Sequence, residues 1–175
     1  MAAQFALKLS REGIGLYRCE GGAWAPVGQA ALDDPDLGGA LAALRAQAAS
    51  GGDGVIDTHL ILPNSEIRYT EVTLEGVAGN EEAAAIRTAI DGLTPYVVSE
   101  LEIDWVRAGD TARVAVIARE TLREAAQFAR AQGFSPVSFG AVPPPGAFPR
   151  DVDFGATADA AADIAGPVEP EPVVA

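Results

Sequence analysis

VIDTHLILPNSEIRYTEVTL, residues 55–74, is the stretch that decides the fold. Its first eight residues form the most apolar strand-like run of the chain, which predicts a central β-strand over 55–62. The sequence Pro63-Asn64-Ser65 predicts a turn. A second strand is expected over 66–74. A buried strand that leads through a tight turn into another strand indicates a sheet-based domain.

The residues before this stretch predict three strands joined by short turns. Apolar and polar residues alternate over 4–10, 14–19 and 24–32, as expected for half-buried strands. Pro26 cannot donate to a strand ladder and marks the third as an edge strand. We therefore expect an antiparallel meander. The acidic residues and proline at 33–35 then predict the start of a helix that ends near Ser50.

The residues after it predict a small inserted strand-helix unit over about 64–108. Asn80 is expected to cap a helix whose buried stripe is Ile86, Ile90 and Leu93. A strand is expected over 101–107.

The chain then returns to strand and helix. A strand is expected over 111–118, and Thr121 and Glu124 have the spacing of a capping box for a helix over 122–132. Gly133 ends this helix, and a last strand follows over 137–142. The domain is thus predicted to span 1–142. The Pro-, Ala- and acid-rich residues 143–175 are expected to be a disordered linker, as in the N-terminal part of a longer protein.

Composition narrows the class of protein. The chain has 175 residues and a net charge of −13, which disfavours a general nucleic-acid surface. Cys19 is the single cysteine and cannot form an intrachain disulfide. No run of 18 apolar residues is present, so no membrane-spanning helix is expected. These features favour a cytoplasmic protein.

Catalytic and metal-binding motifs are weak. Gly13 and Gly15 resemble part of a dinucleotide loop, but no helix follows, so hairpin glycines are expected. His59 lies two residues from Asp57 on one strand face and would be half of an acid–base pair. A metal site would need more ligands, so a satisfied or surface histidine is the favoured interpretation.

Three carboxylates, Asp57, Glu66 and Asp104, are predicted on neighbouring strands. A ribonuclease H-type nuclease holds two metal ions with such a cluster. It also needs an acid on its first strand, where this chain offers only Lys8. A nuclease is therefore the least favoured interpretation.

The predicted order of elements resembles a ribonuclease H-like or actin-like ATPase half-domain. The class is α/β, with an α+β first third, and a mixed sheet is expected. The run from the strand closing in LPNS to AQGFSPVSF is similar to that of PilM-type proteins of type IV pilus assembly and of the cytoplasmic domain of the type II secretion L protein. Pro63, Tyr96 and Asp104 occupy positions that match these families.

This resemblance implies a role and a lost site. The ATPases carry an Asp-x-Gly phosphate signature in the first hairpin, and this chain has Ala6-Leu7-Lys8-Leu9-Ser10 there. The resemblance therefore implies no nucleotide, no cofactor and no enzymatic activity. What remains is a scaffold that binds a protein partner, such as the cytoplasmic tail of a membrane protein, at the inner face of a bacterial membrane.

The partner surface is expected beside the inserted unit. In the PilM-type family a partner's tail lies in a groove there, and the apolar segment around Tyr96 and Val97 lies at this place. Ile67, Tyr69 and Trp105 are the other expected partner-binding residues, since Tyr and Trp are favoured anchors. Packing under the inserted unit is the alternative for Tyr96 and Val97. The alternatives for function are a regulatory adaptor of another pathway, or a degenerate ATPase or nuclease.

Overall fold

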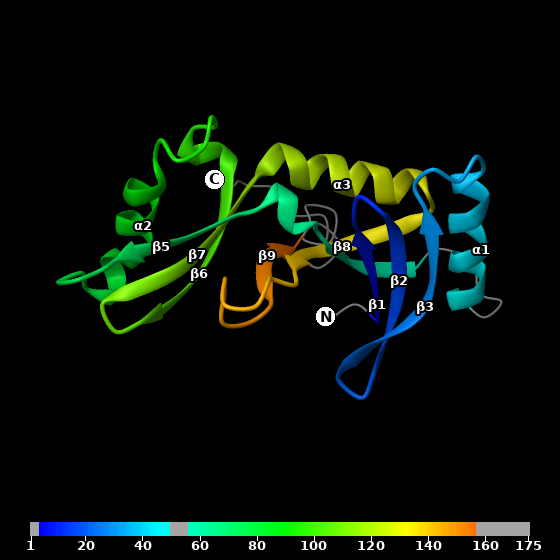
Figure 1. The fold of residues 1–175 in the computed structure, drawn as a ribbon, viewed down its shortest axis with the longest axis horizontal. Coiled ribbons are helices and arrows are strands. Elements are labelled where there is room, and N and C mark those ends of the chain that lie inside the picture. The colour runs from blue at the N-terminus through cyan, green and yellow to red at the C-terminus, as the bar shows by residue number, and fades with distance from the viewer. Residues whose placement is uncertain (1–3, 50–55, 157–175) are drawn as a thin grey trace, which may run out of the picture.

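The protein is built from two β-sheets and three α-helices in the part of the chain that the structure describes. This computed structural model describes residues 4–49 and 56–156. The larger sheet has the strand order β3-β2-β1-β4-β8-β9, and the smaller sheet has the order β5-β7-β6. The two sheets lie at opposite ends of an elongated molecule, and α3 lies along the region that joins them (Figure 1).

The N-terminal meander forms as predicted. β1 (Phe5–Leu9), β2 (Gly13–Glu20) and β3 (Ala23–Ala31) pair in antiparallel order, and β3 is an edge of the sheet. Gly13 is required here because a Cβ at this position would lie 2.6 Å from the Ala30 carbonyl oxygen. The glycines at 13 and 15 are thus strand residues, as the hairpin interpretation expected.

β4 (Ile56–Ile61) is the central strand. It pairs in parallel with β1, where Leu7 faces Leu60, and in parallel with β8 (Phe134–Ala141) on its other side. The strand is central because its apolar side chains can be buried between two neighbours. The prediction of a central strand over 55–62 is confirmed.

Helices α1 (Leu37–Ala49) and α3 (Arg119–Ala131) build the main core against one face of the large sheet. This core includes Leu7, Leu16, Leu41, Leu60, Ala126 and Phe139. A Cβ at Gly28 would meet Leu44 Cδ2 at 2.5 Å, so a glycine in β3 lets α1 approach closely. The capping box predicted at Thr121 and Glu124 is wrong. β7 runs directly into α3, which begins at Arg119 without a side-chain cap.

The small sheet and α2 (Glu82–Ile90) form the inserted unit. Its strands are β5 (Arg68–Thr73), β6 (Leu101–Ala108) and β7 (Thr111–Ala118), and all pairings are antiparallel. β7 is the middle strand, so the unit extends beyond the predicted limit at 108. Its own core joins α2 to the sheet through Val72, Leu74, Ile86, Ile90, Leu101, Val114 and Val116.

Two details of α2 differ from expectation. Asn80 lies inside a 3₁₀ turn, η2 (Gly79–Glu81), which leads into the helix without a side-chain cap. Leu93 lies beyond the end of α2 and is 36% exposed, so the buried stripe consists of Ile86 and Ile90. The helix ends at Ile90, before the turn that holds Gly92 at a φ of 91°.

A ninth strand lies where a disordered linker was predicted. β9 (Val152–Ala156) pairs antiparallel with β8 and forms the other edge of the large sheet. The linker prediction is wrong for residues 143–156, because Phe148, Val152 and Phe154 are buried in the main core. Residues 157–175, for which disorder was also expected, lie outside the described residues.

Candidate partner-binding surface

The connection between α2 and β6 carries the most exposed apolar residues of the inserted unit. Val97 is 59% exposed and Tyr96 is 37% exposed. The Thr94 hydroxyl accepts a hydrogen bond from the Tyr96 amide at 3.1 Å and closes a turn before them. A 3₁₀ turn, η3 (Val98–Glu100), follows. The chain thus presents Tyr96 and Val97 to solvent on a locally hydrogen-bonded segment.

A hollow of about 160 Å³ lies beside Tyr96. Its walls come from the start of β5, the end of β7 and the first turn of α3, so it marks the junction between the inserted unit and the rest of the domain. Arg68 lines it and is exposed. The exposed carboxylate of Glu66 lines it as well, so the hollow combines apolar surface with one guanidinium and one carboxylate group.

Ile67 and Tyr69 face inward at this junction. Ile67 is 8% exposed and belongs to the main core. The Tyr69 hydroxyl donates to Asn64 Oδ1 at 2.6 Å, and its ring lies against Phe148 with centroids 6.4 Å apart. Burial raises the pKa of Tyr69 to about 12. In this structure both residues hold the two sheets together.

Trp105 lies on the opposite face of the small sheet from Tyr69. Tyr69 pairs with Ala115 and Trp105 with Val114, the next residue of β7, so their side chains point to opposite faces. The Trp105 indole donates to Glu82 Oε1 at 2.8 Å and holds α2 on the sheet. The five residues predicted as partner-binding therefore do not line one groove, and only Tyr96 and Val97 are exposed.

Glu82 is the centre of the polar contacts under α2. It also accepts from Arg107 Nη1 at 3.2 Å, and Arg107 donates further to the carbonyls of Leu74 and Val77. The hydrogen bonds from Trp105 and Arg107 lower the pKa of Glu82. This arrangement fixes the position of α2, and with it the start of the connection that carries Tyr96.

His59 is a packed residue on the face of the large sheet that α1 and α3 leave uncovered. Its Nδ1 lies 2.7 Å from Ser138 Oγ, and its ring stacks on Trp24 with a centroid distance of 6.4 Å. Burial lowers the pKa of His59, and the charges of Asp153 and Asp151 act in the opposite direction. The hydrogen-bond partner is thus Ser138, where Asp57 was considered, and the satisfied histidine of the favoured interpretation is observed.

The three carboxylates of the nuclease hypothesis do not meet. Asp57 lies in β4 of the large sheet, Asp104 lies in β6 of the small sheet, and Glu66 lies in the 3₁₀ turn η1 (Asn64–Glu66). The prediction that they lie on neighbouring strands is wrong, because β5 and β6 belong to the small sheet and β4 to the large one. Across residues 4–49 and 56–156, no cluster of three potential metal ligands occurs.

The turn between β1 and β2 follows the run from Ala6 to Ser10, in which the sequence resemblance implies a lost phosphate signature. Ser10 Oγ donates to the Gly13 carbonyl at 2.8 Å, and the Ser10 amide donates to the same oxygen at 3.1 Å. Two hollows of about 400 and 300 Å³ flank this turn and share Lys8, Ser10 and Glu12. The polar groups of Ser10 are thus used to close the turn.

No helix within the described part of the chain has the length and apolar character needed to span a membrane.

No protein-family model matches the sequence of this chain, and no curated protein matches it. Similarity is found among solved structures.

One such structure is the cytoplasmic domain of EpsL, an inner membrane component of the type II secretion system of Vibrio cholerae. It matches with a TM-score of 0.58 and 17% identity over 81% of this chain. Another is the PilM–PilN type IV pilus biogenesis complex, with a TM-score of 0.57 and 17% identity over 79% of this chain. The chain spans 60% and 47% of the length of these matched chains. The predicted resemblance is therefore confirmed at the level of the fold: this chain has an α/β fold similar to those of the EpsL cytoplasmic domain and of a chain in the PilM–PilN complex.

Proposed function

We propose that this domain is a non-enzymatic protein-interaction platform of a type II secretion or type IV pilus machine, placed at the cytoplasmic side of the membrane. The observation that carries the proposal is the exposed Tyr96–Val97 segment beside a hollow of about 160 Å³ at the edge of the inserted unit. Its fold matches to an inner membrane component and to a PilM–PilN complex support a role in such an assembly.

The surface suits a short protein segment with an apolar side chain. An aromatic residue and a β-branched residue are exposed together, and aromatic residues are favoured anchors at interfaces. The hollow is small, so it would take about one side chain. Arg68 and Glu66 on its wall can each pair with a group of opposite charge on the partner. The cytoplasmic tail of a membrane protein is the partner we propose.

Loss of nucleotide binding is part of this proposal. The run from Ala6 to Ser10 has no acid that could stand for the metal-binding Asp of the ATPases. The Ser10 hydroxyl donates its hydrogen bond to the Gly13 carbonyl. Thermal unfolding with and without magnesium and ATP tests this point. We expect the same melting temperature at millimolar nucleotide, and a rise of several degrees would instead favour the degenerate ATPase.

The partner surface is tested with matched substitutions. We expect Val97→Asp to weaken binding of the cytoplasmic tails of membrane proteins encoded beside this chain by at least about tenfold, since it places a charge in an apolar contact. Leu32→Asp is the matched control. Leu32 is 44% exposed and lies in the turn that follows β3, the edge strand of the large sheet. Equal affinities for both variants would exclude this surface. Binding of a soluble regulator, with no response to any membrane-protein tail, would favour the adaptor alternative.

A further inference from the structure

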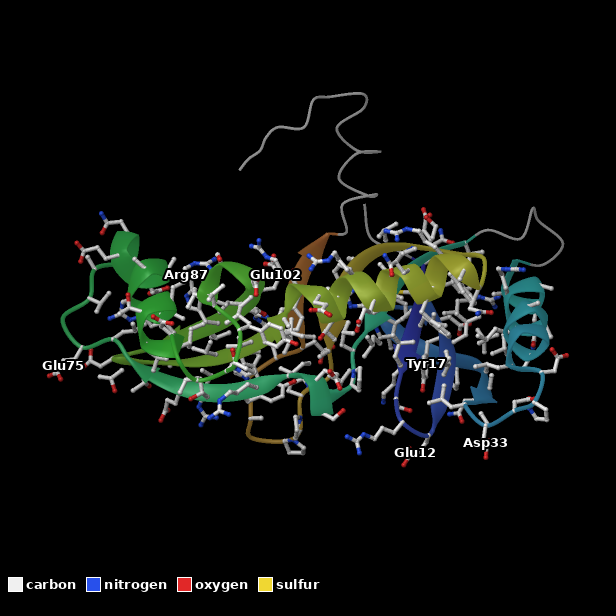
Figure 2. The ribbon with its side chains drawn as sticks, turned by 90° about the horizontal axis from the view of Figure 1, so that it is seen from above. Glu12, Tyr17, Asp33, Glu75, Arg87 and Glu102 are labelled. Atoms are coloured by element: carbon white, nitrogen blue, oxygen red, sulfur yellow. The ribbon has the colours of Figure 1, made fainter. Side chains whose placement is uncertain are left out.

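A row of arginines lines a hollow of about 400 Å³ along α3. Arg119, Arg123 and Arg130 come from one side of the helix, because their spacings of four and seven residues return to the same face. Phe139 of β8 contributes to the apolar part of the wall, and Glu102 of β6 closes one end. Figure 2 shows Glu102 beside the start of α3. We call this hollow the arginine groove.

The arginine groove is a concentrated positive site on a strongly negative protein. The chain has a net charge of −13 and 12 Lys and Arg residues in total, and three of them line this one hollow. One carboxylate already lies there, since Glu102 Oε2 is 2.9 Å from Arg119 Nε. Arg123 is exposed on the helix surface. The groove is therefore suited to further carboxylates from an acidic segment.

The last strand of the described chain runs beside this place. In the register of β8 and β9, Gly155 faces Phe139, a wall residue of the arginine groove, and Ala156 faces Ser138. Because β9 is antiparallel to β8, its direction leads along β8 toward Phe134. α3 packs over that part of β8, where Ala129 and Phe134 share the main core. The end of β9, which precedes residues 157–175 in the sequence, thus lies next to the groove.

The sequence of this segment matches the groove in charge and in length. Residues 157–175 contain Asp159, Asp163, Glu169 and Glu171 and no Lys, Arg or His. An extended chain covers about 3.3 Å per residue. The 13-residue helix α3 is about 20 Å long. Fewer than half of the residues in the segment would therefore suffice to run past all three arginines.

We propose that the acidic segment of residues 157–175 binds in the arginine groove along α3. Single surface ion pairs are weak. A covalent tether supplies the segment at an effective concentration of about a millimolar, so several weak pairs can act together. Bound in this way, the segment covers the basic groove and keeps other acidic chains out of it. The contact is electrostatic and is therefore weakened by salt.

The test is paramagnetic broadening in the full chain. A nitroxide spin label is attached to Cys in an Ala165→Cys variant, with Cys19→Ser to remove the exposed native thiol. Amide signals of α3 and the start of β8 are expected to broaden, and those of α1 to remain sharp. Arg123→Glu is expected to reduce the broadening of α3 at least about twofold, as is salt of about 1 M, where the Debye length is about 3 Å.

Arg11→Glu is the matched control. It makes the same charge change at an exposed residue, and the next residue, Glu12, lies on the side of the molecule away from α3 (Figure 2). Amide spectra of both variants report whether they remain folded. The proposal is wrong if α3 shows no local broadening, or if Arg123→Glu and Arg11→Glu reduce it equally. Broadening of an isotope-labelled chain by a separate spin-labelled chain would place the segment on a second copy and also overturn the proposal.

Discussion

Asp104 joins the inserted unit to the C-terminal strand of the large sheet, and its removal should loosen that joint. Its carboxylate accepts from Arg150 Nη1 at 2.7 Å and Nη2 at 3.0 Å, and from the Asp153 amide at 2.9 Å. Only 13% of the Asp104 side chain is exposed, whereas 47% of Arg150 is. Asp104 therefore connects β6 with β9 and with the segment before it.

The expected cost of Asp104→Ala follows from these contacts. The ion pair contributes about 1 kcal/mol at most, because the exposed guanidinium can be rehydrated. The Asp153 amide loses its acceptor at an exposed position, where water can replace it, so this hydrogen bond contributes about 1 kcal/mol at most. The free energy of unfolding should thus fall by about 1–2 kcal/mol. For a domain of this size that lowers the melting temperature by roughly 2–8 °C.

Glu102→Ala provides the matched control for this experiment. Glu102 also lies in β6 and pairs with an arginine, but 35% of its side chain and 45% of Arg119 are exposed. We expect a loss of no more than about 1 kcal/mol. Thermal unfolding gives the melting temperatures, and hydrogen exchange reports the amides of β9. If Asp104→Ala costs no more than Glu102→Ala and leaves β9 exchange unchanged, the joint assigned to Asp104 is incorrect.

Three titrating groups give further predictions. The lowered pKa of His59 disfavours its protonated form in the folded state. The free energy of unfolding of the wild type should therefore begin to fall as the pH drops through about 6.5. Urea unfolding at a series of pH values should show no such fall for His59→Gln. The lowered pKa of Glu82 contributes stability at pH values above its ordinary pKa, and this contribution is lost as the pH falls through the folded-state pKa. Glu82→Gln should therefore be less stable than the wild type at neutral pH and should lose less stability in acid. Equal dependence of stability on pH in both proteins would contradict this. Tyr69 should ionise at about pH 12 in an ultraviolet titration, so its raised pKa costs stability as the pH rises above about 10; Tyr69→Phe should remove that step.

Most of the large sheet could be predicted from local sequence. Asp57 is the one charged residue in the apolar run of β4, and its side chain is exposed. A run with so few charges is typical of a central strand, which has a neighbouring strand on each side. Turn residues between the first three strands fixed the meander, and Pro26 identified its edge. These signals lie within a few residues of the structure that they specify.

β9 could not be predicted in this way. Phe148, Val152 and Phe154 are separated by one proline, one arginine and two acids, so they show no regular alternation beyond two strand positions. They are buried because β8 and β6 provide the surface on which they pack. The position of β9 is therefore set by residues far away along the chain. One of them is Asp104, which binds Arg150 across a sequence separation of 46.

The division of the predicted partner residues between two faces has a similar cause. Within β5 the side of Tyr69 relative to Thr70 is fixed by alternation, and within β6 the side of Trp105 relative to Asp104 is fixed in the same way. Nothing local relates one strand to the other. That relation is set by β7, on which Ala115 pairs with both Tyr69 and Asp104. A shift of one residue in either pairing would have put Tyr69 and Trp105 on the same face, so the make-up of an interaction surface on this inserted unit depends on the register of β7 more than on the aromatic residues themselves.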